Sequence, residues 1–153
     1  KFDRAYFLCY NIINEIKEAI FMVVRKTMSN LEIYNTATSL SELFTEMVQT
    51  EIKLPVKVNF YFQKNMNALV AMAQELEKER TNIIMKYGSP DPEDPNKIQI
   101  SPDKIEEANR ELNDLFSLEQ EVAVNVIELD WFNEINMTPQ QVNAITFMIK
   151  DEE

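Results

Sequence analysis

Histidine is absent from this 153-residue chain, and glycine occurs once, at Gly88. Without histidine, the chain lacks the commonest general base and the commonest side-chain ligand for transition metals. A single glycine excludes a glycine-rich phosphate loop and a dinucleotide-binding fingerprint, because both need several glycines at close spacing. We therefore predict a protein that is not an enzyme, with no catalytic residues, no cofactor and no metal site.

Cysteine also occurs once, as Cys9, between Leu8 and Tyr10. Its apolar neighbours favour a small buried side chain over a thiol nucleophile. One cysteine cannot form an intramolecular disulfide, which suggests a reducing compartment or indifference to redox conditions. Polar residues interrupt the apolar positions of residues 2–28, so this region lacks both the run of about 20 apolar residues that spans a bilayer and the pattern of a signal peptide. No membrane association is expected.

Basic residues are few, with 15 Lys and Arg against 26 Asp and Glu, giving a net charge of −11. Because sequence-independent nucleic-acid binding depends on neutralising phosphates, this balance argues against direct nucleic-acid binding. It fits a protein that binds a basic protein surface, or one whose charge serves only solubility. The length suits one domain, and 45% hydrophobic residues suit a folded one.

One long helix is predicted from Pro55 to Gly88. Proline suits the first helical turn, and a glycine followed by a proline ends a helix. Apolar residues between these limits follow a heptad pattern, which predicts a narrow buried stripe. They are Phe62, Met66, Leu69, Ala73, Leu76, Ile83 and Tyr87.

A first helix is predicted over residues 2–28 by the same heptad spacing. Two heptad helices in one chain indicate packing on each other or on further copies, so a homo-oligomer is one expectation. We treat residues 1–28 as an N-terminal helical extension and 29–153 as a single domain organised on the long helix. The candidate helix–helix interface is Tyr6, Ile13, Ile16, Ile20 and Val23.

Short strands are predicted where the apolar pattern alternates. The best is Glu121–Leu129, which is rich in valine and needs a neighbour such as Leu31–Tyr34 or Lys97–Ile100. A helix is predicted to begin at the capping-box pattern Ser39–Glu42. Residues 89–96, with three prolines and three acids, predict a loop. The fold class is therefore mainly α (α+β), with long heptad helices packed on a small two- or three-stranded sheet.

Two further helices are indicated in the C-terminal third. Ser101-Pro102 predicts the start of one that runs to about Leu118, and Thr138 with Gln141 predicts the cap of another, with Val142, Ile145 and Met148 in its buried face. Trp131 and Phe132 are expected in the core. The solvent face of the first helix carries the candidate partner-binding acidic residues Glu106, Glu107, Glu111 and Asp114.

Several short motifs occur in a recognisable order. They are Lys53-Leu54-Pro55-Val56-Lys57, Glu77-Lys78-Glu79-Arg80, Lys86-Tyr87-Gly88, Asn109-Arg110-Glu111-Leu112-Asn113-Asp114-Leu115, the valine-rich strand, and Met137-Thr138 to Phe147-Met148-Ile149. Over residues 31–153 this order resembles a small family of helical proteins of unknown function encoded by bacteriophages or prophages. The resemblance implies a phage origin and an accessory role, and it implies no catalytic residues. Residues 1–27 lie outside it.

Two functional hypotheses follow. The first is a non-enzymatic phage accessory protein that binds a host or phage protein, as a host-directed inhibitor or anti-defence factor, with nucleic-acid mimicry by the acidic face as one variant. The second is a structural or assembly component of the virion, such as a scaffold, connector or tail part. The expected location is accordingly the host bacterial cytoplasm or the virion.

Overall fold

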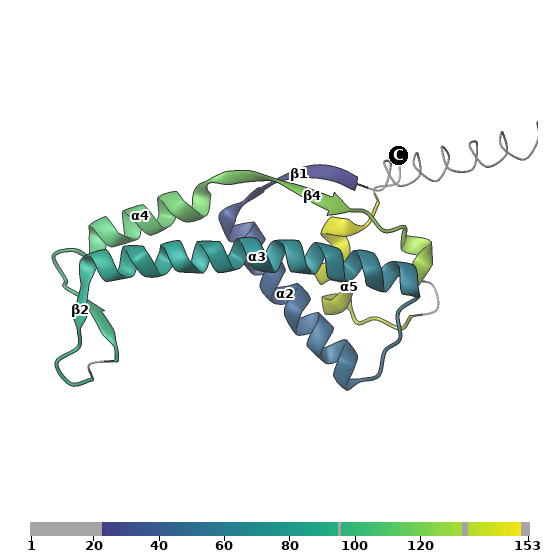
Figure 1. The fold of residues 1–153 in the computed structure, drawn as a ribbon, viewed down its shortest axis with the longest axis horizontal. Helices are drawn as coiled ribbons and strands as arrows, with labels where there is room; N and C mark the ends of the chain where they lie inside the picture. Colours follow the sequence, from purple (N-terminus) through teal and green to yellow (C-terminus); the bar gives the residue numbers. More distant parts are fainter. Residues whose placement is uncertain (1–22, 95, 133–134, 151–153) are drawn as a thin grey trace, which may run out of the picture.

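The computed structural model describes residues 23–150, except for 95, 133 and 134. Its longest element is helix α3 (Val56–Tyr87), around which the other described elements are arranged (Figure 1). The predicted long helix is thus confirmed, with Pro55 as its N-cap. Phe62, Leu69 and Leu76 of the predicted stripe are buried, so the heptad pattern identified the face of α3 that packs inward.

Gly88 ends α3, as predicted, but its backbone is not left-handed, with φ at −100°. What requires glycine here is space. A Cβ atom would lie 2.8 Å from the carbonyl oxygen of Ile84 and would collide with the side chain of Ile98. The single glycine therefore lets strand β3 (Ile98–Ile100) approach the end of the helix closely.

Helix α2 (Asn30–Gln49) corrects two predictions, the strand at Leu31–Tyr34 and the helix start at Ser39–Glu42. The capping box lies ten residues earlier. The Ser29 amide donates to the Glu32 carboxylate at 2.7 Å, and the Glu32 amide donates to the Ser29 hydroxyl at 3.2 Å. A stripe at helical spacing overrides the short alternation that suggested a strand. Its buried members are Ile33, Ala37, Leu40, Leu43 and Met47.

Strand β1 (Val23–Ser29) pairs antiparallel with β4 (Glu119–Asn125), from Val23 opposite Asn125 to Ser29 opposite Glu119. The helix predicted over 2–28 is therefore wrong for residues 23–28, while residues 2–22 lie outside the described part of the chain. The predicted valine-rich strand exists, but it runs from Glu119 to Asn125 and not from Glu121 to Leu129, and neither proposed neighbour pairs with it. Val23, Val24 and Thr27 are β-branched, which favours the extended backbone they adopt.

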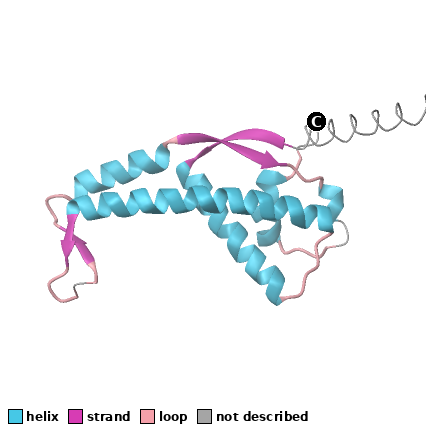
Figure 2. Ribbon diagram, viewed as in Figure 1, coloured by secondary structure: helices cyan, strands magenta, loops and turns pink. Residues whose placement is uncertain are grey.

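A second antiparallel pair, β2 (Gly88–Pro90) with β3 (Ile98–Ile100), projects from the far end of α3 (Figure 2). It confirms a short strand within Lys97–Ile100. Helix α4 (Ile105–Ser117) then returns along α3 towards β4. The predicted start at Ser101-Pro102 is wrong, because residues 101–104 form a turn in which the Lys104 amide donates to the Ser101 carbonyl at 2.9 Å.

The C-terminal segment contains the short 3-10 helix η1 (Leu129–Phe132), helix α5 (Pro139–Ile145) and the 3-10 helix η2 (Thr146–Met148). The capping box of Thr138 and Gln141 is confirmed, as is burial of Ile145 and Met148, whereas Val142 is 43% exposed. Phe132 is buried and Trp131 half-buried. The Ile127 amide donates to the Met148 carbonyl, which fastens this segment to the end of β4.

The core lies between α2, the N-terminal half of α3, β4 and the C-terminal segment. The rings of Phe44 and Phe62 stack there, with centroids 6.3 Å apart. Together these elements confirm the mainly α (α+β) class, with two two-stranded sheets. The largest fully buried side chains are Phe62, Ile33, Leu40, Leu69, Ile127, Ile145, Met148, Val58 and Val124.

A buried amide pair joins α3 to β4. Asn65 is 2% exposed and Asn125 is 5% exposed. The Asn65 side chain donates to the Asn125 carbonyl at 2.8 Å and accepts from the Asn125 backbone amide, also at 2.8 Å. One side chain thus satisfies both backbone groups of the last residue of β4, which would otherwise be unpaired in the core.

We predict that Asn65→Ala destabilises the protein by about 2–3 kcal/mol, because it leaves a buried amide and a buried carbonyl without partners. The free energy of unfolding is measured by urea denaturation followed by circular dichroism. Asn67→Ala, at an exposed position of the same helix, is the matched control and is expected to change stability by less than about 0.5 kcal/mol. Equal effects of the two substitutions would contradict this role for Asn65.

Candidate functional site

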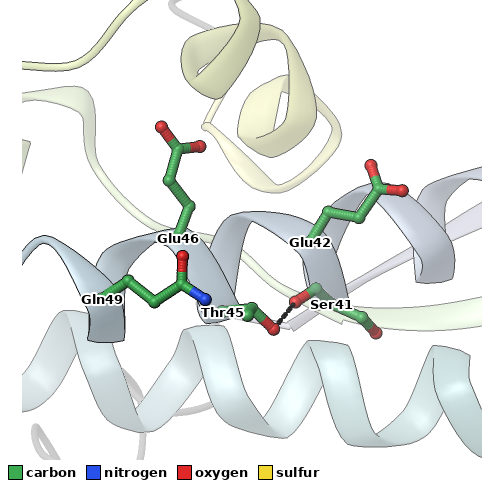
Figure 3. Close-up of a pocket in the computed structure, with 5 residues that line it drawn as sticks. All are labelled: Ser41, Glu42, Thr45, Glu46 and Gln49. Carbon is green, nitrogen blue, oxygen red and sulfur yellow. Dashed lines mark hydrogen bonds between the residues drawn. The ribbon is translucent and has the colours of Figure 1, made fainter.

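Three hollows on the described surface lie around α2. One of about 350 Å³ is lined by Ser41, Glu42, Thr45, Glu46 and Gln49 (Figure 3). A second, of about 340 Å³, lies between α2 and α3, and a third, of about 210 Å³, lies between α2 and α5. Glu42 borders all three.

Two hydroxyl groups line the first of these hollows, those of Ser41 and Thr45. The Thr45 hydroxyl donates to the Ser41 carbonyl at 2.9 Å, and the Ser41 hydroxyl donates to the Ala37 carbonyl at 2.8 Å. Both hydroxyls therefore donate to a backbone carbonyl of their own helix, and not to a general base of the kind that activates a nucleophile for covalent catalysis. Across the residues that the structure describes, no three His, Cys, Asp or Glu side chains converge to hold a metal ion.

The predicted acidic face divides into two parts. Glu106, Glu107 and Asp114 are exposed on α4. Glu111 instead faces α3, where its carboxylate accepts from Lys86 at 2.5 Å and from the Tyr87 hydroxyl at 2.7 Å. Glu111 is therefore part of the contact between the two helices, and its side chain is 38% exposed.

These bonds shift the titration of both charged groups. The hydrogen bond from Lys86, followed by that from Tyr87, holds the pKa of Glu111 below its usual 4.5. The bond to Glu111 correspondingly raises the pKa of Lys86 above its usual 10.5. Since the pair is solvent-accessible, its effect on stability is modest and decreases with salt.

The predicted helix–helix interface falls mostly outside the described residues, which do not include Tyr6, Ile13, Ile16 or Ile20. Its last member, Val23, lies in strand β1 and is 42% exposed. The described residues of the predicted N-terminal helix, from Val23 onward, therefore form an edge strand and not a helix.

A surface that the sequence prediction missed lies on the N-terminal half of α3. Val56 is 87% exposed and Phe60 is 62% exposed, one helical turn apart. Lys57 and Lys64 are exposed beside them. The Lys57 ammonium lies 4.4 Å from the centroid of the Trp131 ring. We call Val56, Lys57, Phe60, Lys64 and Trp131 the Phe60 surface.

Aromatic contacts hold the Phe60 surface together. Phe60 meets Tyr61 edge-on at 5.6 Å between ring centroids, and Tyr61 stacks on Trp131 at 6.5 Å. Such contacts position large apolar groups with little freedom. The signal was present in the sequence, because Val56 and Phe60 have helical spacing but fall outside the heptad seam. What the sequence did not show was that η1 brings Trp131 to the same place.

Among the helices of the described residues, none combines the length and the apolarity that crossing a bilayer requires. Comparison with known protein families, with curated proteins and with solved structures finds no significant match to this chain.

We predict that Glu111→Gln makes the protein less stable at neutral pH and that this difference disappears in acid. The pKa of Glu111 is lower in the folded chain than in the unfolded one, so its stabilisation is complete above about pH 4.5 and is lost as the pH falls through the folded pKa. Urea unfolding of both proteins between neutral pH and acid measures the difference.

Glu93→Gln, at an exposed position in the loop between β2 and β3 and away from any helix terminus, is the control. It is expected to leave stability unchanged at every pH. Glu32, whose pKa is lowered by hydrogen bonds from Ser29, is present in all three proteins and cancels in the comparison. A Glu111→Gln effect that persists unchanged below the folded pKa would show that the lost charge is not its cause.

Proposed function

We propose that this protein acts without enzymatic activity, by binding another protein, and that the Phe60 surface is the contact. The observation that carries the proposal is the exposure of Val56 and Phe60 beside a half-buried tryptophan. Exposed apolar residues rimmed by charge are typical of interaction sites, and aromatic residues dominate the binding energy of such sites.

Rigidity supports the same proposal. Val58 and Phe62, which flank Phe60 along α3, are each 1% exposed. The backbone that presents Phe60 is therefore fixed by the core on its opposite side. A surface that is already ordered loses little conformational entropy on binding, which leaves more of the contact energy for affinity.

The sequence resemblance supplies the biological setting of the proposal. A phage accessory protein that binds a host or phage protein, as a host-directed inhibitor or anti-defence factor, would need a binding surface and no catalytic centre. The proposed location is the host bacterial cytoplasm, where the partner would be met.

Assembly into a virion is the second candidate, and the β1–β4 pair favours it. Within the described residues neither strand has a further strand beside it, and Val23 and Val24 of β1 are 42% and 36% exposed. An unpaired strand edge can extend into a sheet with another copy or another protein. A discrete ring or larger assembly in mass photometry would support this candidate, and a monomer at micromolar concentration would count against it.

We predict that Phe60→Ser reduces binding of the protein partner by roughly thirtyfold, corresponding to about 2 kcal/mol, the loss found on truncating a central aromatic contact. The tagged wild type and variant are purified from phage-infected bacteria, bound proteins are identified by mass spectrometry, and the affinity of the pair is measured by calorimetry.

Met85→Ser is the matched control, since Met85 is 59% exposed on the other half of the same helix. It is expected to bind like the wild type. Both substitutions lie at the surface and should leave the unfolding free energy within about 0.5 kcal/mol. If Phe60→Ser retains the partner at full affinity, or if no protein is bound by the wild type, the Phe60 surface is not the contact.

A further inference from the structure

The exposed row of α3 that contains Phe60 is free of acidic residues over its whole N-terminal half. Between Glu51 and Glu75 the chain has three lysines, Lys53, Lys57 and Lys64, and no Asp or Glu. This stretch lies in a chain of net charge −11. The half of α3 that carries Val56 and Phe60 therefore has a net positive charge, because it contains Lys57 and Lys64 and no acidic residue.

Helix geometry places these groups along one line. Val56, Phe60 and Lys64 follow each other at four-residue spacing, so they cover about 12 Å of one helix face. Farther along, Asn67, Ala68 and Ala71 are exposed, small and uncharged. The face is apolar at Val56 and Phe60 and basic at Lys64, and beyond Lys64 it carries only small, uncharged side chains as far as Ala71.

The net negative charge of the chain does not cancel this local pattern at short range. At physiological ionic strength the Debye length is about 8 Å, so a group in contact with Lys64 interacts mainly with charges in its immediate surroundings. Asp130, which is exposed, directly precedes Trp131 in the chain. Lys57 and Lys64 are the charged groups on the exposed row of α3 itself, and they favour a partner that presents carboxylates to this row.

A polynucleotide fits this surface less well than an acidic protein segment. Single-stranded nucleic acids stack their bases on open aromatic faces. Here Tyr61 stacks on Trp131 and Lys57 lies over the Trp131 ring. A long polyanion would also extend beyond three lysines onto a strongly acidic surface, whereas a short acidic segment would not.

We propose that the Phe60 surface binds an acidic segment of a partner protein, with apolar side chains of the segment against Val56 and Phe60 and its carboxylates against Lys57 and Lys64. This inference rests on the proposed protein-binding function and adds the chemistry of the partner. Carboxylates beside lysines would set the orientation of the segment, and the apolar contacts would supply most of its affinity.

The test is a photo-crosslink. Benzoylphenylalanine replaces Phe60 in the full chain, and the same residue replaces Met85 as the control. Both proteins are irradiated in infected cells, and the crosslinked peptides are sequenced by mass spectrometry. We expect adducts that form at position 60 and not at 85, on a protein segment with net negative charge and apolar residues.

Charge reversal provides the second arm. Lys64→Glu should lower the affinity for the crosslinked partner at least tenfold, and the wild-type affinity should fall as NaCl rises from about 50 to 300 mM. Lys78→Glu, at an exposed position in the other half of α3, should change the affinity less than twofold. Trp131 is the single tryptophan of the chain, so its fluorescence emission reports occupancy of the Phe60 surface in these titrations.

The outcomes are distinct. Adducts with nucleic acid, with a second copy of the chain, with residues 1–22 of the same chain or with a basic segment would overturn the inference. Adducts with no protein at either position would overturn the proposed function as well. A protein partner whose affinity is unaffected by Lys64→Glu and by salt would be compatible with the proposed function. It would overturn the inference that the bound segment is acidic.

Discussion

The length of α3 is the constraint on which the rest of the structure depends. Its 32 residues extend for about 48 Å, whereas a compact domain of 153 residues has a radius of gyration of about 15 Å and hence a diameter of roughly 39 Å. The helix is therefore longer than any single core that the chain can form. One face of its N-terminal half packs on the core, and its C-terminal half is covered separately by α4 and the β2–β3 pair (Figure 1).

The two halves of α3 are consequently stabilised by different interactions. In the first half, Val58, Phe62 and Leu69 are each 1% exposed, and the buried Asn65 fixes the helix to the end of β4. Leu76 is the last buried residue of the helix. Beyond it, side chains are half-buried or exposed, and the contact with α4 includes the solvent-accessible bonds of Lys86 and Tyr87 to Glu111. Because exposed ion pairs contribute little, we expect this end to open locally at lower free energy than the core.

Local signals in the sequence predicted the long elements well. They did not predict contacts between residues that are distant in the sequence. The heptad stripe and the capping box at Thr138 act within one helix, so the chain itself indicates them. The pairing of β1 with β4 joins residues almost a hundred positions apart, and nothing in Val23–Ser29 indicates its partner. The strand predicted at Leu31–Tyr34 fails because four alternating residues also fit one helical turn, and only the longer stripe from Ile33 to Met47 distinguishes the two.

The candidate site follows the same division. The sequence indicated a solvated acidic face on α4, and three of its four members are exposed there, but Glu111 faces α3 because Lys86 and Tyr87 lie within reach. The Phe60 surface could be predicted in part, since Val56 and Phe60 lie off the seam and the acid-free stretch is visible in the sequence. The position of Trp131 could not, because it depends on the fold of the whole C-terminal segment.

A further consequence of the long helix concerns where binding energy can be used. Phe60 lies on the half of α3 whose opposite face is buried, so a partner meets a backbone that the core already holds. An exposed apolar residue on the other half, such as Met85, is carried by a helix covered by α4 and a short strand pair. Binding there would have to offset the cost of ordering a less stable region, whereas binding at Phe60 would not. The core thus favours the basic, apolar half of α3 as the contact, for the same reason that it fixes the position of the helix.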